Sequence, residues 1–84
     1  MPKLVMFNDD VTPMDFVVDV LQDLFEKSYD EAIKIMLDVH RHGQAVCGVY
    51  ADAQARDLLS EATRLAGEAG YPLRFSLADT GSPG

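Results

Sequence analysis

Three short apolar runs limit the folds open to this chain, because each has the length and composition of a β-strand. Residues 3–7 and 45–51 are mostly apolar, and residues 73–77 alternate between apolar and polar side chains, as a half-exposed strand does. Gly48 inside the second run indicates a bulge or a close approach by another backbone. Three strands this short cannot bury a sheet by themselves, so helices must cover one face.

The segments between these runs have the apolar spacing and the start and stop signals of amphipathic helices. A capping-box pattern begins the second helix, since a serine is followed three residues later by a glutamate. The expected cap and stop residues are Thr12, Ser28, Asp52, Gly43 and Gly70.

The resulting order of elements is β-α-α-β-α-β. It predicts an α+β fold, a small two-layer sandwich in which a three-stranded antiparallel sheet is covered by three helices. Residues 3–78 are expected to form this single core domain, which suits a chain of 84 residues. Residues 79–84 are rich in turn-forming residues and are expected to form a flexible C-terminal tail.

The composition limits the partners and the compartment. Seven basic and 14 acidic residues give a formal net charge of −7, which argues against nucleic acid and anionic membranes and suits a cationic partner. A single cysteine rules out an intrachain disulfide and a multi-thiolate zinc site. No apolar run approaches the ~18 residues of a membrane span, and the start of the sequence lacks the apolar core of a secretion signal. We expect a cytoplasmic monomer without a cofactor or a metal.

Asn8, Asp9 and Asp10 form a polar cluster between a predicted buried strand and a predicted buried helix. By themselves they fit a solvated turn with local hydrogen bonds, and His40 fits a structural histidine near a helix end. A catalytic or metal site built from these side chains is weakly supported, because no second histidine at ligand spacing, phosphate loop or nucleophile motif accompanies them. We therefore do not expect an enzyme.

The sulfur-containing residues also have simple interpretations. Met14 and Met36 fit gap-fillers of the core, although methionine also lines adaptable binding surfaces. Cys47, on a predicted strand, fits an inert, small apolar residue.

Four blocks of the sequence are more specific together than any one of them alone. They are NDDVTPMDFV (8–17), MLDVH (36–40), VCGVY (46–50) and YPL (71–73). In this combination the chain resembles the ClpS family from Lys3 to Leu77. The resemblance implies an adaptor of the bacterial N-end rule (N-degron) pathway, which binds substrates with an N-terminal Phe, Tyr, Trp or Leu and hands them to ClpAP or a related AAA+ protease.

The resemblance also implies which residues bind the substrate. Asn8, Asp10 and His40 should hold its α-amino group, with Asp9 close by. The residues that should line the side-chain pocket are Thr12, Met14, Val17, Met36, Val39 and Leu73. Met14 should act as the gatekeeper that rejects β-branched side chains.

The chemistry of these residue types suits an α-ammonium group. That group has three N–H donors and a positive charge, and Asn8, Asp10 and a neutral His40 offer one acceptor each. An internal residue has only one amide N–H and no charge, so it would leave acceptors unsatisfied. We expect a preference for free N-termini.

Some features depart from the family's pattern. Ala53 and Leu58 stand where the family commonly has an acid and a lysine that face ClpA or a related unfoldase, so the docking surface is expected to be altered. Leu58 also fits simple core packing. The family usually has a flexible N-terminal extension, whereas this sequence starts almost at the first strand, so binding is better supported than delivery. The alternative function is a protein–protein interaction module without N-terminal-residue specificity.

Overall fold

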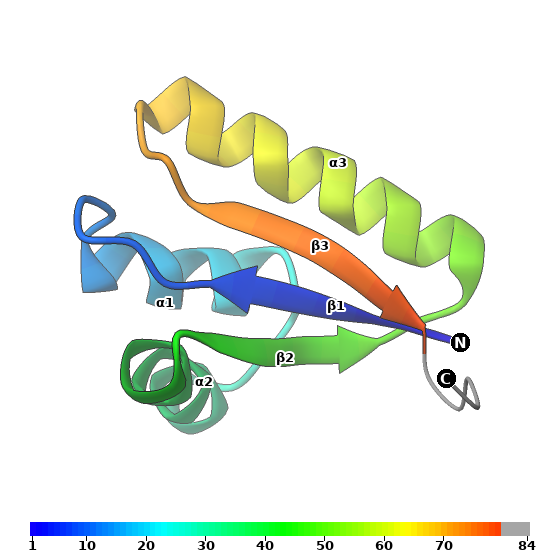
Figure 1. The fold of residues 1–84 in the computed structure, drawn as a ribbon, viewed down its shortest axis with the longest axis horizontal. Coiled ribbons are helices and arrows are strands. Elements are labelled where there is room, and N and C mark those ends of the chain that lie inside the picture. The colour runs from blue at the N-terminus through cyan, green and yellow to red at the C-terminus, as the bar shows by residue number, and fades with distance from the viewer. Residues whose placement is uncertain (80–84) are drawn as a thin grey trace.

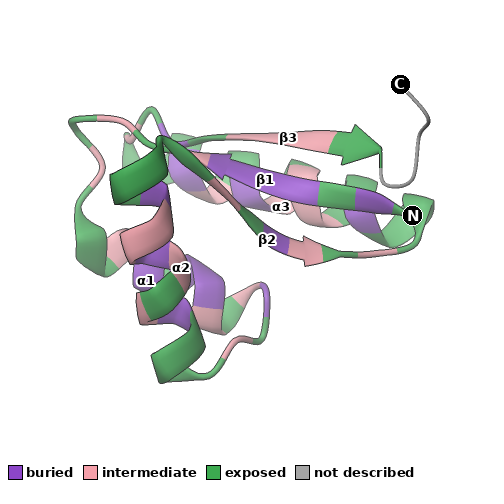
Figure 2. Ribbon diagram, turned by 60° about the horizontal axis from the view of Figure 1, so that its bottom comes forward, coloured by how far each residue is buried: buried purple, intermediate pink, exposed green. Residues whose placement is uncertain are grey.

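The computed structural model describes residues 1–79, and its elements follow the predicted order. They are β1 (Pro2–Phe7), α1 (Met14–Asp23), α2 (Tyr29–His42), β2 (Gln44–Val49), α3 (Asp52–Ala69) and β3 (Arg74–Asp79). The three strands form one antiparallel sheet with the spatial order β2-β1-β3 (Figure 1). The helices pack against the sheet: α3 runs along β3 and contacts β1, whereas α2 contacts β2 and is seen nearly end-on beside it in Figure 1 (Figures 1 and 2). The predicted α+β architecture is confirmed.

The second helix begins and ends at the predicted residues. The Ser28 hydroxyl accepts a hydrogen bond from the Glu31 backbone N–H at 3.2 Å, and the Glu31 carboxylate accepts one from the Ser28 backbone N–H at 3.1 Å. This capping box satisfies two backbone donors that the helix itself leaves free. Gly43 ends α2 with φ of 85° and Gly70 ends α3 with φ of 81°, a conformation that costs glycine least.

The caps expected at Thr12 and Asp52 are wrong. Helix α1 starts at Met14 with Pro13 as its N-cap, and no side chain caps it. Thr12 lies one residue before the cap position, and its hydroxyl donates to Asp9. Helix α3 starts one residue earlier than expected, so Asp52 is its first helical residue and not its cap. The carboxylate of Asp52 still lies in the first turn, where the helix dipole favours negative charge.

The expected irregularity near Gly48 is present. The register between β1 and β2 shifts between Leu4 and Val5, which leaves Cys47 as the extra residue of a bulge beside Gly48. A Cβ atom at Gly48 would lie 2.5 Å from the hydroxyl oxygen of Tyr50. The close approach is therefore made by an aromatic side chain and not by another backbone.

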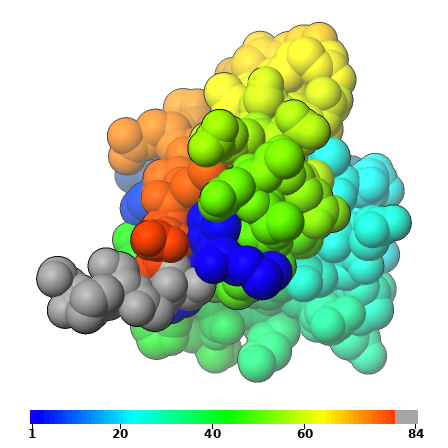
Figure 3. Space-filling view, turned by 90° about the vertical axis from the view of Figure 1, so that its right-hand side faces the viewer, coloured from blue at the N-terminus to red at the C-terminus, as the bar shows by residue number. Residues whose placement is uncertain are grey.

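The two ends of the described chain pair with each other. Asp79 lies opposite Pro2 in the β1–β3 ladder, so residue 79 belongs to the sheet and not to a tail. Residues 80–84, the rest of the expected tail, lie outside the described residues. Figure 3 shows this end of the molecule, where the start of the chain lies against the start of α3.

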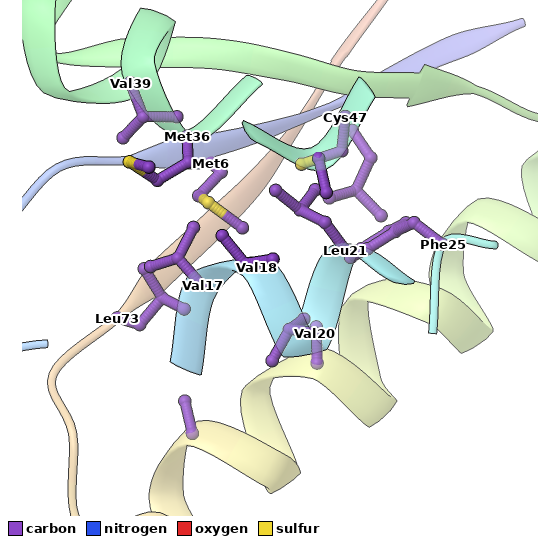
Figure 4. Packing of buried hydrophobic residues seen from close by; sticks show 14 residues of the cluster. Met6, Val17, Val18, Val20, Leu21, Phe25, Met36, Val39, Cys47 and Leu73 are labelled. Carbon is purple, nitrogen blue, oxygen red and sulfur yellow. The ribbon is translucent and has the colours of Figure 1, made fainter. Parts of the chain in front are cut away.

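The core lies between the sheet and the helices. Its fully buried large side chains come from β1, α1 and β2, and they are Leu4, Met6, Leu21 and Cys47. Figure 4 shows the last three of them. Burial raises the pKa of the Cys47 thiol to about 12. The thiol is therefore protonated at neutral pH, in agreement with its interpretation as an apolar core residue.

Candidate functional site

The loop of residues 8–13 joins β1 to α1 at the end of the molecule opposite to the paired Pro2 and Asp79 (Figure 1). The backbone N–H of Asn8 donates to the carbonyl of Gly43 at 2.9 Å. Because Gly43 ends α2, this bond holds the start of the loop against the end of the helix that carries His40 in its last turn. Two segments about thirty residues apart in the sequence thus meet at one place.

Asp9 organises this loop through three hydrogen bonds. Its carboxylate accepts from the backbone N–H of Val11 at 2.8 Å, from the backbone N–H of Thr12 at 2.6 Å and from the Thr12 hydroxyl at 2.8 Å. Partial burial raises the pKa of Asp9, but the bonds from Thr12 and Val11 outweigh it, so the net pKa is lower than usual. Asp9 is therefore a carboxylate at neutral pH, already occupied by its own loop.

Helices α1 and α2 supply the apolar side of the site. Val17 on α1 and Met36 and Val39 on α2 are buried, with 7 %, 9 % and 3 % of their surfaces exposed. His40 follows Val39 directly and lies about one helical turn after Met36, so their side chains reach the same end of α2. Figure 4 shows Met36 and Val39 extending from α2 towards the region occupied by Met6 and Val17.

One hollow collects nine of the ten candidate residues. We call it the loop pocket, and it has a volume of about 230 Å³. Its lining residues are Asn8, Asp9, Asp10, Thr12, Met14, Val17, Met36, Val39 and His40. This volume is below the ~300–1,000 Å³ of pockets for drug-sized ligands, which suits a ligand as small as one amino-acid residue.

The loop pocket has a polar rim and an apolar floor. Asn8, Asp10 and His40 are exposed at the rim, whereas Val17 and Val39 are buried. Such an arrangement can bind a ligand with a polar or charged head and an apolar body, because each part meets groups of its own kind.

Two of the ten candidates, Leu73 and Met14, are placed differently from what the sequence predicted. Leu73 is 5 % exposed and belongs to the core cluster, but it does not line the loop pocket. Met14 is 51 % exposed at the first turn of α1, so the interpretation as a core gap-filler is wrong for this methionine. Its partly exposed side chain lies in the wall of the pocket.

A second hollow was missed by the sequence reasoning. We call it the α1–α2 groove; it has a volume of about 440 Å³ and shares Met14 and Met36 with the loop pocket. Its lining residues are Met14, Asp15, Val18, Asp19, Gln22, Tyr29, Ile33 and Met36. The available signal was the i,i+4 spacing of Asp15 and Asp19, which places both carboxylates on one face of α1.

Two negative findings apply to residues 1–79. No helix in this part of the chain is long and apolar enough to cross a membrane. Within the same range, no group of three or more His, Cys, Asp or Glu side chains is arranged to hold a metal ion.

Comparison with known proteins agrees with the resemblance of the four sequence blocks. The family model of the ATP-dependent Clp protease adaptor protein ClpS matches residues 1–76. The ATP-dependent Clp protease adapter protein ClpS of Wolinella succinogenes is 44 % identical over 77 residues, which cover 92 % of this chain and 76 % of the relative. The protein of the same name from Leptospira biflexa is 49 % identical over 76 residues, which cover 90 % of this chain and 67 % of the relative.

A solved structure agrees in fold as well as in sequence. It is that of Agrobacterium tumefaciens ClpS2 bound to L-phenylalaninamide, with a TM-score of 0.88 and 40 % identity. The match covers 92 % of this chain and 93 % of that one. Together with the family model and the curated relatives, it establishes that this chain belongs to the ClpS family of ATP-dependent Clp protease adaptors.

Proposed function

We propose that the loop pocket binds the N-terminal residue of a substrate polypeptide. It binds both the free α-amino group and the bulky hydrophobic side chain of Phe, Tyr, Trp or Leu. We also propose that this protein delivers such N-degron substrates to a Clp AAA+ protease. The observation that carries this proposal is the meeting of three exposed acceptors, Asn8, Asp10 and His40, above an apolar floor in one hollow. Membership in the adaptor family supports the delivery role.

The rim suits an ammonium group and not an amide. A bound ammonium needs acceptors for three donors and at least one negative charge, because an unpaired buried charge costs several kcal/mol. Asn8 offers a carbonyl oxygen, Asp10 a carboxylate and neutral His40 a ring nitrogen. Since Asp9 is occupied by Thr12 and Val11, we assign it to positioning the loop and not to direct contact with the amine.

The floor suits one large apolar side chain. Transfer of a Phe or Leu side chain from water to such an environment contributes about 1.5–3 kcal/mol. Val17, Met36 and Val39 supply apolar contacts, and the exposed Met14 closes the mouth. In this proposal Met14 rejects a side chain branched at Cβ, because the second carbon on Cβ would meet the thioether. Leu73 supports Val17 from the core in this proposal.

The ligand of the related structure has the same two groups. L-Phenylalaninamide, bound to Agrobacterium tumefaciens ClpS2, combines a free α-amino group with a benzyl side chain. Its amide takes the place of the peptide bond that follows a first residue. This chemistry supports the same type of ligand for the loop pocket.

The unfoldase would meet a different part of the surface. The start of α3 lies at the end of the molecule opposite to the loop of residues 8–13, which lines the loop pocket (Figure 1). There Ala53 is exposed and uncharged, whereas Leu58 is half-buried and packs against the core, which fits the alternative interpretation of Leu58. A partner bound at this end would leave the loop pocket open to substrate.

Peptides that differ only in their first residue test this proposal against an interaction module without N-terminal specificity. Fluorescence anisotropy would be measured with C-terminally labelled peptides that begin with Phe, Tyr, Trp, Leu, Val, Gly or Asp. We expect the first four to bind. The Gly and Asp peptides should bind at least about tenfold more weakly, the effect of 1.4 kcal/mol of lost apolar transfer, and the Val peptide should bind more weakly than the first four because its β-branch meets Met14. Equal affinity for all seven peptides would contradict the proposal.

A further inference from the structure

The α1–α2 groove lies next to the loop pocket. Met14 and Met36 line both hollows, so a ligand that fills the loop pocket meets the groove at these two side chains. The groove then follows α1 as far as Gln22 and reaches Tyr29 at the start of α2. At about 440 Å³ it is the larger of the two.

The chemistry of the groove suits a basic side chain among apolar ones. Val18 and Ile33 give it an apolar base, and Asp15 and Asp19 place two exposed carboxylates along one side. No Lys, Arg or His side chain is among its lining residues. Tyr29, which is 61 % exposed, offers an aromatic face at the far end. A carboxylate pair with an accessible aromatic ring is a favourable environment for ammonium or guanidinium.

The length of the groove corresponds to a few residues of extended chain. From Met14 to Gln22 the axis of α1 rises by about 12 Å, and from Met14 to Asp19 by about 7.5 Å. An extended peptide advances about 3.3–3.6 Å per residue. Two steps beyond a first residue held at Met14 therefore bring the third residue level with Asp19.

We propose that the α1–α2 groove binds the second to fourth residues of the substrate and selects Lys or Arg at the third position. This inference rests on the proposed function of the loop pocket, because the first residue must be anchored there for the register to apply. Asp19 and Tyr29 are the specificity-determining residues, and the apolar base holds the backbone and the neighbouring side chains. Substrates are then distinguished by a basic third residue as well as by their first residue.

The test uses three labelled peptides, Phe-Ser-Arg-Gly-Ser, Phe-Ser-Ser-Gly-Ser and Phe-Ser-Glu-Gly-Ser, with fluorescence anisotropy at low salt. We expect the Arg peptide to bind about three- to tenfold more tightly than the Ser peptide, the size of one exposed ion pair plus a cation–π contact. The Glu peptide should bind more weakly than the Ser peptide. Asp19→Asn should bring the Arg and Ser peptides to nearly equal affinity.

Asp57→Asn is the matched control, because it removes the same charge from an exposed site on α3 outside both hollows. We expect this variant to keep the preference for Arg. Equal affinity of the Arg and Ser peptides for the unmodified chain would overturn the inference while leaving the proposed function intact, since the Ser peptide still reports binding of the first residue. Equal loss of the preference in both variants would also overturn it, because only the net charge would then matter. If none of the three Phe-initiated peptides bound, the proposed function would fail, and this inference with it.

Discussion

Replacing Asp9 by alanine should weaken peptide binding even though Asp9 is not assigned a contact with the substrate. The substitution removes the acceptor of three hydrogen bonds, from Val11, from the Thr12 backbone and from the Thr12 hydroxyl. Without them the loop of residues 8–13 has to be ordered again when the ligand binds. Asn8 and Asp10, which flank Asp9, would then no longer be held in place for the amine.

The expected loss follows from the number and the setting of these bonds. A hydrogen bond to a charged group contributes about 1.5–3 kcal/mol when it is buried. Asp9 is partly exposed, so hydrogen bonds to water compensate for much of this free energy. We therefore expect a total loss of about 1–2 kcal/mol in binding free energy. The dissociation constant should therefore rise by about 5–30-fold.

Isothermal titration calorimetry with a Phe-initiated peptide measures this loss, and urea denaturation in parallel shows that the variant is folded. Asp9→Asn keeps one acceptor oxygen and should lose less affinity than Asp9→Ala. Asp57→Ala, an equal loss of charge on the surface of α3, should leave affinity nearly unchanged. An Asp9→Ala affinity within twofold of the original would refute the reasoning.

The contribution of Asp9 to the stability of the folded protein depends on pH with a defined sign. The hydrogen bonds lower the pKa of Asp9 in the folded protein, so the unfolded chain takes up this proton first as the pH falls. This stabilisation is fully present above the ordinary pKa range of carboxyl groups. It is lost as the pH falls through the lowered pKa of Asp9 in the folded protein. Asp9 therefore does not account for any change of affinity between about pH 7 and pH 5.

Three further results are expected. Met14→Ala should admit Val- and Ile-initiated peptides, because the smaller side chain enlarges the mouth of the loop pocket. Competition binding measures this, and unchanged discrimination against these peptides would show that Met14 is not the gatekeeper. His40→Ala should weaken the binding of Phe-initiated peptides, because it removes one of the three acceptors at the rim, and His42→Ala should not; equal affinities of these two variants would contradict the role of His40. Cys47 should resist alkylation at pH 8 in the folded protein, because burial raises its pKa to about 12, and it should react once the protein unfolds. Rapid labelling of the folded protein would contradict this and would show that β2 opens.

Most of the fold could be predicted because its signals are local. The capping box of Ser28 and Glu31 and the stop at Gly43 lie within a few residues of the backbone groups that they satisfy. The failures occurred where two local options competed. The signals at Thr12 and Pro13 fit a helix that starts at either residue, and the structure starts α1 at Met14, so that Pro13 takes the cap position and Thr12 bonds to Asp9 instead.

The site was less accessible to local reasoning. By composition alone, Asn8 to Asp10 fit a solvated turn, and Asp9 does make the local hydrogen bonds of such a turn. What brings this turn to His40 is the contact between the Asn8 N–H and the Gly43 carbonyl, which depends on how β1 and β2 pair. The family resemblance connected the two segments before the structure did. It gave no sign of the α1–α2 groove, which exists only once α1 and α2 are packed together.

The central claim is that a free, positively charged amine is recognised at the rim of the loop pocket. Calorimetric titration of one Phe-initiated peptide, with its N-terminus free or acetylated, tests it most directly, because acetylation removes the charge and two donors but keeps the side chain. We predict that acetylation weakens binding by at least about 2–3 kcal/mol, or about 30–150-fold, the loss of charge-assisted hydrogen bonds. Equal affinity of the two peptides would contradict the account.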